Sequence, residues 1–288
     1  MYSIRRLIAL PALERVIGEQ KIVYTLRIAC AMCFIGHGAF GVITKPIWCN
    51  YFAVFGIDQQ LSYQLMPVVG IIDILFGLLL LFYPLRGFFA WLVIWGTITA
   101  LLRPLSGEPV AEFFERAGNY GAPFMLLLIT ASGINMKQNL AARISTSIRL
   151  TPDDSKKIIL GLRIAAFLIF LGHGWLNLIE KKGLLDQYHS FGFSDIHLVS
   201  RIVGIAEVAA AFILLFKPVP WLVLMLFLWK MGSELFYPNY EIFEFVERGG
   251  SYGILLALWF SLTGWPRFKI LPKEGMSIRD LLCPPHNV

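Results

Sequence analysis

The residues of this chain that could carry proton chemistry occur twice. His37 and His173 each lie between two glycines inside an apolar segment. Asp73 and Glu207 occupy matching places in the next apolar segment of each half. An imidazole titrates near neutral pH and can pass protons, and a carboxylate inside a membrane must be paired or protonated. The duplicated histidine and acid therefore predict a ligand-binding or redox site.

A second repeated motif is an acid followed directly by an arginine, with a tyrosine four positions after the arginine. It comprises Glu115, Arg116 and Tyr120 in the first half and Glu247, Arg248 and Tyr252 in the second. Arg103 adds a cation to the first-half set, whereas Tyr237 stands at the matching position of the second half. We include all of these residues in the candidate ligand-binding site.

The composition indicates an integral membrane protein. The 288 residues are 57% hydrophobic and 15% charged, whereas ordinary soluble domains carry about a quarter charged residues. Continuous apolar runs, each near the roughly 20 residues that cross a bilayer, predict an all-α fold with eight transmembrane helices and exclude an alternating β-barrel. The expected spans are residues 22–44, 65–83, 86–103, 118–136, 158–179, 198–216, 219–237 and 250–266.

The spans form two four-helix units. Because four is an even number, both units enter the membrane in the same orientation, which predicts parallel repeats. We expect a cytoplasmic N-terminal segment (1–20), a first four-helix repeat (21–137), a cytoplasmic linker (138–157), a second four-helix repeat (158–266) and a cytoplasmic tail (267–288). The N-terminal segment could form a short interfacial helix, and Thr151 is expected to cap the fifth span.

Lysine and arginine set the expected orientation. They are more numerous on the side of the N-terminus, so the positive-inside rule places both termini in the cytoplasm, and we expect the bacterial inner (plasma) membrane. The formal net charge of +6 follows from the same bias and requires no nucleic acid as a partner. Membrane lipids are the expected surroundings.

Helical rise places the repeated polar residues at one depth. At about 1.5 Å per residue, His37 lies about 10 Å and Asp73 about 12 Å below the outer surface. Arg103 and the acid-arginine motifs fall at outer helix ends, so the set converges on the outer third of the bilayer. Arg103 beside Asp73 and His37 favours the first half as the binding half, whereas Lys230 and Glu234 could neutralise each other.

Each of these residues also has a purely structural interpretation. A histidine between glycines could hydrogen-bond across a close helix crossing, and the acids could simply be paired with His37 or Arg103. The acid-arginine motifs could be interfacial ion pairs, and the tyrosines ordinary interfacial aromatics. Cys30 and Cys33 share a helical face with His37, but the second half has Ala166 and Ile169 there, so we expect small buried hydrophobes and no metal site.

The four-helix pattern resembles the DoxX/DoxD-like membrane protein family. The resemblance rests on Arg27 with Gly36-His37-Gly38 in the first helix, an acid in the second, and Glu115-Arg116 with Gly118-Asn119-Tyr120 before the fourth. The chain resembles two such units in tandem. The resemblance implies a membrane subunit serving redox chemistry at the quinone pool, as in thiosulfate:quinone oxidoreductase. It implies a quinone or similar lipophilic redox ligand, and a partner redox protein could dock on the outer face.

Two alternatives of other classes stay open, and the residues leave open whether the chain is an enzyme. Parallel repeats with intramembrane acids also suit a proton-coupled small-molecule transporter, or a non-catalytic scaffold subunit of a larger complex. A b-type haem held by His37 and His173 is a further alternative, because both histidines lie at the same depth. No charged residue other than Arg27 and Arg163 is expected in the inner half of the spans, so no path through the membrane is evident.

Overall fold

The computed structural model describes residues 2–131, 140–144, 148, 150–238 and 241–263, and these residues are almost entirely helical. The first half contains α1 (Tyr2–Val42), α2 (Trp48–Ala53), α3 (Gln59–Phe82), α4 (Arg86–Leu105), α5 (Ala111–Glu115) and α6 (Ala117–Ala131). The second contains α7 (Pro152–Leu178), α8 (Lys182–Ser190), α9 (Ile196–Phe216), α10 (Pro220–Leu235), α11 (Glu241–Glu247) and α12 (Gly249–Thr263). The expected all-α fold is confirmed for the described part of the chain.

Five of the described helices are long and apolar enough to cross a membrane. They are α3, α4, α7, α9 and the part of α1 from Gly18 to Val42. Helices α6 and α12 are apolar but only 15 residues long, and α10 has 16 residues. A 15-residue helix rises only about 23 Å. The short helices α5 and α11 precede α6 and α12 directly, so each final helix of a half is made of two pieces.

Helices α1 and α7 both begin before the expected starts of their spans, residues 22 and 158. The segment 1–20 does not form a separate element, because α1 runs without a break from Tyr2 into the first span, and no proline interrupts the chain from residue 12 to residue 42. Helix α7 begins at Pro152, inside the expected linker. The side chain of Thr151 caps it as expected, since its hydroxyl oxygen accepts from the amide of Asp154 at 3.1 Å. The expected tail at 267–288 lies outside the described residues.

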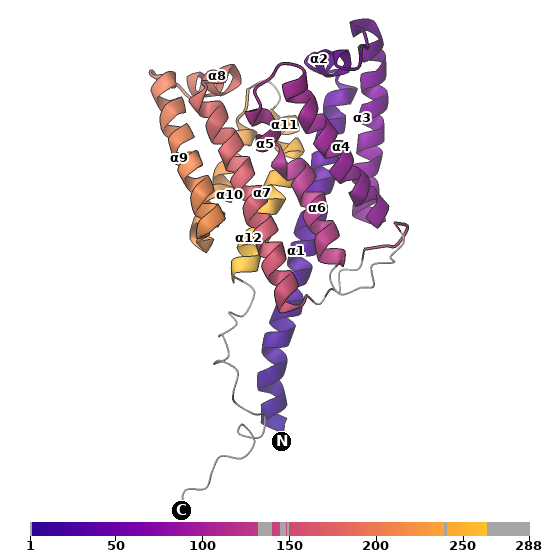
Figure 1. The fold of residues 1–288 in the computed structure, drawn as a ribbon, viewed down its shortest axis with the longest axis vertical. Coiled ribbons are helices and arrows are strands. Elements are labelled where there is room, and N and C mark those ends of the chain that lie inside the picture. The colour runs from indigo at the N-terminus through magenta and orange to yellow at the C-terminus, as the bar shows by residue number, and fades with distance from the viewer. Residues whose placement is uncertain (1, 132–139, 145–147, 149, 239–240, 264–288) are drawn as a thin grey trace, which may run out of the picture.

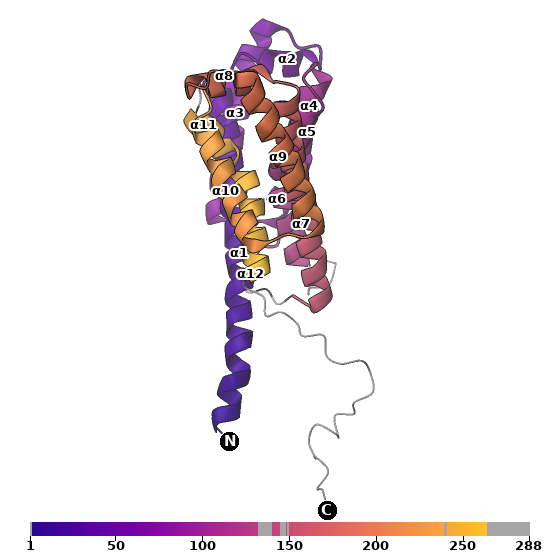
Figure 2. The same ribbon diagram turned by 90° about the vertical axis from the view of Figure 1, so that its left-hand side faces the viewer.

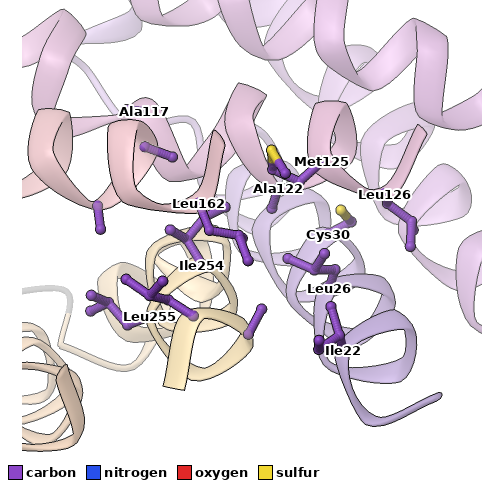
Figure 3. Packing of buried hydrophobic residues seen from close by; sticks show 14 of the residues in the cluster. Ile22, Leu26, Cys30, Ala117, Ala122, Met125, Leu126, Leu162, Ile254 and Leu255 are labelled. Atoms are coloured by element: carbon purple, nitrogen blue, oxygen red, sulfur yellow. The ribbon is translucent and has the colours of Figure 1, made fainter. Parts of the chain in front are cut away.

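Four helices form the centre of the molecule. Helices α1, α6, α7 and α12 pack against one another, and α3, α9, α4 and α10 flank α1, α7, α6 and α12 in that order. Figure 1 shows α2, α5, α8 and α11 toward the upper end and the start of α1 at the lower end. Figure 2 shows the same arrangement from the side. The centre is filled by apolar side chains from all four helices, such as Leu26, Met125, Leu162 and Leu255 (Figure 3).

The first glycine of each Gly-His-Gly motif admits the backbone of the other half. A Cβ on Gly36 would collide with the backbone of Glu247, and a Cβ on Gly172 would collide with the backbone of Glu115. Small residues allow such close approach between membrane helices. The Gly-His-Gly motif of each half is therefore in direct contact with the acid-arginine motif of the opposite half.

The second glycine of each motif admits the next helix of its own half. Gly38 faces Gly70 of α3, and Gly174 faces Gly204 of α9, with too little room for a Cβ on any of these glycines. These crossings bring α3 against α1 and α9 against α7 beside the histidines. The Gly-His-Gly motif is thus explained by two close helix approaches on either side of one polar side chain.

The repeated arginines Arg27 and Arg163 have a structural role. Arg27 Nε donates to the carbonyl of Leu80 at 2.7 Å, and the guanidinium of Arg163 donates to the carbonyl of Leu215. These carbonyls lie in the last turns of α3 and α9, where no intrahelical donor is available. Arg27 and Arg163 therefore cap the lower ends of two helices, ten residues before the histidine on the same helix.

Candidate functional site

In the first half, the histidine, acid and tryptophan of three helices meet. His37 Nδ1 lies 2.7 Å from Asp73 Oδ2, and Trp95 Nε1 donates to the same carboxylate oxygen at 3.4 Å. Asp73 is only 2% exposed. Asp73 therefore faces the protein interior and is paired with His37, which is one of the two partners that the sequence left open.

The second half repeats this unit with more donors. His173 Nδ1 lies 2.7 Å from Glu207 Oε2, and Trp229 Nε1 donates to the other carboxylate oxygen at 2.7 Å. Asn177 Nδ2 also donates to Glu207 Oε2 at 3.2 Å, and the hydroxyl of Tyr188 donates to Asn177 Oδ1 at 2.6 Å. The same pairing of histidine and acid therefore occurs in both halves, but the second carboxylate is held by three side chains and not two.

A pocket lies beside each histidine. The first lateral pocket, of about 90 Å³, is lined among others by His37, Trp48, Tyr51, Phe52, Trp95 and Thr99. The second lateral pocket, of about 260 Å³, is lined by His173, Gln187, Tyr188, Phe191, Leu228, Trp229, Gly232, Ser233 and Phe236. Most of these lining residues stand at matching positions of the two halves. Each histidine unit thus has its own space for a small group.

The acid-arginine motifs pair across the two halves. Arg116 lies 3.4 Å from Glu247, and Arg248 lies 3.2 Å from Glu115. All four side chains are buried, with at most 7% of any residue exposed. A buried charge requires a partner of opposite sign, and removal of one partner is strongly destabilising. Each half therefore supplies the counter-ion that the other half needs.

A second crossed pair uses residues that the sequence prediction missed. Lys45 lies 2.6 Å from Glu244, and Lys181 forms an ion pair with Glu112. Lys45 and Lys181 follow the first helix of each half at matching positions, and Glu112 and Glu244 each lie three residues before a motif acid. Their repetition was the signal that could have identified them.

The ionisation of Glu112 and Lys181, which lie outside the spans, is coupled to this pairing. Burial alone would raise the pKa of Glu112, but the charges of Lys181 and Arg103 lower it below its usual value. Burial alone would lower the pKa of Lys181, but the carboxylate of Glu112 raises it above its usual value. Both groups are therefore charged at neutral pH, and their contribution to stability is lost as the pH falls through the acid range of Glu112.

Arg103 does not lie in an ion pair with the His37 unit, contrary to expectation. Its guanidinium lies 3.2 Å from Glu108 and 3.4 Å from Glu112. On α4, Arg103 is eight residues beyond Trp95, a rise of about 12 Å, and Trp95 is the residue level with Asp73. Arg103 does line the first lateral pocket, at the end nearest the loop, where its charge is already neutralised.

Lys230 and Glu234 do pair, at 2.5 Å, but Lys230 is not neutralised by Glu234 alone. Lys230 is fully buried and also donates to Glu115 of the other half at 2.9 Å. Arg248 lies within 3.3 Å of Glu234. The two acids and two cations form a closed cluster that joins α5 to α10. The Lys230–Glu234 pair therefore links the two halves and is not an isolated pair within α10.

The tyrosines of the repeated motif lie apart from the histidines. Tyr120 donates its hydroxyl to the carbonyl of Phe113 at 3.3 Å and stacks on that ring. Tyr252 is buried at 5% exposure, and its hydroxyl has no hydrogen-bond partner among the described residues. Neither tyrosine lines a lateral pocket. The predicted site therefore has a histidine part and an ion-pair part, which meet in the first half, where Arg116 and Glu247 line the first lateral pocket with His37.

The ion-pair part surrounds a chamber between the halves. This central chamber, of about 300 Å³, is lined by cations and acids from both halves: Lys45, Arg103, Arg116, Lys181 and Arg248, with Glu108, Glu115, Asp186, Glu234 and Glu244. His173 lines the chamber as well as the second lateral pocket, whereas His37 lines only the first lateral pocket. A polar solute or water could therefore reach the second histidine unit through the chamber.

Among the described residues, no group of three or more histidine, cysteine or acidic side chains is placed to hold a metal ion. Cys30 and Cys33 are buried, at 1% and 4% exposure, in the apolar core. No family model, curated protein or solved structure matches the chain. The arrangement of its own side chains is thus the basis for a functional argument.

Replacing the two acids by leucine should destabilise the protein unequally. Glu207→Leu removes the acceptor of two donors, His173 Nδ1 and Trp229 Nε1, and one of two oxygen acceptors of Asn177 Nδ2, whereas Asp73→Leu removes the acceptor of two donors, one of them in a long bond. Each such donor costs about 1–3 kcal/mol. We expect a larger fall in melting temperature for Glu207→Leu, measured by circular dichroism in detergent micelles. Glu207→Gln and Asp73→Asn, which keep an acceptor, should lose less.

The exposed Asp153, replaced by asparagine, is the control for loss of a carboxylate. Equal and negligible losses for both leucine variants would mean that the acids are bystanders and would remove the basis of the histidine units.

Proposed function

We propose that this chain is a DoxX-like integral membrane protein of eight spans, arranged as two parallel four-helix repeats. The matched contacts support it: each Gly-His-Gly motif meets the acid-arginine motif of the opposite half, and each ion pair between motifs has a counterpart. In this arrangement α6, α10 and α12 complete the crossings that the five long helices leave open, and α5 and α11 lie at the outer ends of α6 and α12. Both termini are then cytoplasmic, and the membrane is the bacterial inner membrane.

Cysteine labelling tests this topology. Lys156 and Ser194 are exposed and lie at opposite ends of the bundle, so Lys156→Cys and Ser194→Cys are matched reporters in a background without Cys49 and Cys283. A membrane-impermeant maleimide should label Ser194→Cys in intact cells and Lys156→Cys only after permeabilisation. The reverse pattern would invert the topology, and labelling of both sites in intact cells would exclude it.

We propose further that the protein binds a quinone or a similar lipophilic redox ligand near the outer face and serves a membrane oxidoreductase system. The observation that carries the proposal is the histidine–acid–tryptophan unit at the wall of each lateral pocket. With Nδ1 held by the carboxylate, Nε2 is the ring nitrogen left to interact with a ligand carbonyl or hydroxyl. The carboxylate stabilises the imidazolium, so each histidine can accept a proton from a bound hydroquinone.

Electrons need a separate acceptor in this account. Oxidation of a hydroquinone releases two electrons and two protons, and imidazole and carboxylate side chains carry only the protons. A partner redox protein docked on the outer face is the proposed recipient of the electrons. The central chamber provides a polar route by which protons from the second histidine unit reach the outer solution.

The alternatives receive less support. The chamber favours a polar solute, as a transporter would require, but the apolar core of α1, α6, α7 and α12 fills the centre of the bundle (Figure 3), and the lower arginines cap helix ends. A scaffold role would leave the lateral pockets without use. A b-type haem between His37 and His173 would require one shared cavity, whereas the two histidines line different pockets.

Analysis of bound lipid tests the ligand proposal. Purified protein should contain a quinone, identified by solvent extraction and mass spectrometry, and its visible spectrum should show no haem band. We expect at least one of the two single variants, His37→Ala and His173→Ala, to lose at least three quarters of this quinone. His197→Ala is the matched control, because His197 is about half exposed and pairs with Glu180 outside the pockets. Quinone content unchanged in both pocket variants would contradict the proposal.

A further inference from the structure

An apolar groove opens between α9 and α10, facing outward from the bundle. This tail groove, of about 400 Å³, is lined by small and aliphatic side chains that include Ile202, Ala206, Ala210, Leu222 and Met225. Ile202 and Met225 are more than half exposed, so the groove is open on the side where a membrane protein meets lipid. Its lining is apolar except where it reaches Glu207.

The tail groove is continuous with the second histidine unit. Glu207 and Trp229 lie at its inner wall, and Trp229 also lines the second lateral pocket. The hydrogen bond of 2.7 Å between the indole of Trp229 and Glu207 therefore stands between the groove and the pocket that contains His173. A hydrocarbon chain in the groove and a polar ring in the pocket would lie on the two sides of one indole.

The first half has large rings at the corresponding positions. Ala210 is matched by Phe76, Leu222 by Phe88 and Met225 by Trp91. Phe76 and Phe88 pack edge to face with centroids 5.4 Å apart, and Trp91 stacks on Trp95 at 5.8 Å. These rings occupy the space that the second half leaves as a groove. The two halves therefore differ here in the size of these three side chains.

We propose that only the second half holds a tailed ligand, with an isoprenoid or alkyl chain in the tail groove and the polar head in the second lateral pocket beside His173. The choice of a quinone-like head rests on the proposed function, whereas the hydrocarbon occupant follows from the nearly complete absence of polar lining and the opening toward lipid. The second lateral pocket is also the larger of the two, at about 260 Å³ against about 90 Å³, and Gln187, Tyr188 and Ser233 give its wall polar groups. The reason for favouring the first half, Arg103 beside Asp73, is absent from the structure.

Transplanting the ring residues tests this inference. Leu222→Phe/Met225→Trp writes the first-half residues into the groove, and Phe88→Leu/Trp91→Met is the matched control in the other half. Ala206→Ile, at a position exposed to lipid, is a second groove variant for the case that the double variant does not fold. The probes are decylubiquinone and the tail-less quinone with the same ring, titrated by calorimetry into protein in nanodiscs.

We expect groove variants to weaken decylubiquinone binding at least tenfold, with less than a twofold change for the tail-less quinone and no weakening in the control. Unchanged binding of both quinones to the groove variants would overturn the inference and leave the proposed function standing. If neither quinone binds the wild type, the proposed function fails. A decyl-chain diazirine probe then tests separately whether the groove holds a hydrocarbon chain. Photo-crosslinks on α9 and α10 that the groove variants lose would support a hydrocarbon chain in the groove. The absence of such crosslinks would overturn the inference.

Discussion

The structure depends on a reciprocal exchange of counter-ions between its two halves. Arg116 and Arg248 are buried, and each is neutralised by the motif glutamate of the opposite half, Glu247 and Glu115. A charge withdrawn from water in this way is costly unless its partner stays in place. Separating the halves would remove one counter-ion from each motif, although Arg248 would keep Glu234, Glu244 and Glu247 of its own half at 3.3–3.7 Å. The close approach at Gly36 and Gly172 brings each acid-arginine motif within reach of the other, so the crossed ion pairs depend on these two glycines.

Around this common centre the two halves have diverged. Both retain the histidine, acid and tryptophan unit, which suggests one chemical task at two places. Their surroundings differ: aromatic rings fill the outer face of the first half, whereas small residues leave a groove in the second. Lys230 adds a cation at the second unit's inner side and joins it to Glu115. A single working site, with the first half as its structural counterpart, is consistent with these differences.

Much of the arrangement could be predicted from the sequence, because duplication marks residues that would otherwise look incidental. Helical depth placed Asp73 and His37 at one level, but it left His37 and Arg103 as alternative partners of the acid. Arg103 was misplaced because a few residues along a helix amount to more than 10 Å, and the nearest acids came from a loop whose path the sequence does not specify. The crossing of ion pairs between halves was not foreseen, since a repeat shows which residues correspond but not which copies meet. Lys45 and Lys181 were missed for the same reason.

The most direct test of the crossed exchange is a double-mutant cycle on Arg116→Met and Glu247→Gln, with unfolding followed in mixed micelles. The account predicts a coupling free energy of about 1–3 kcal/mol, within the range for contacting residues in one network. The exposed pair Lys156–Asp153, treated in the same way, should give about 0.2–1 kcal/mol. A coupling across the halves no larger than that of the exposed pair would contradict the account, because the buried charges would then not depend on each other.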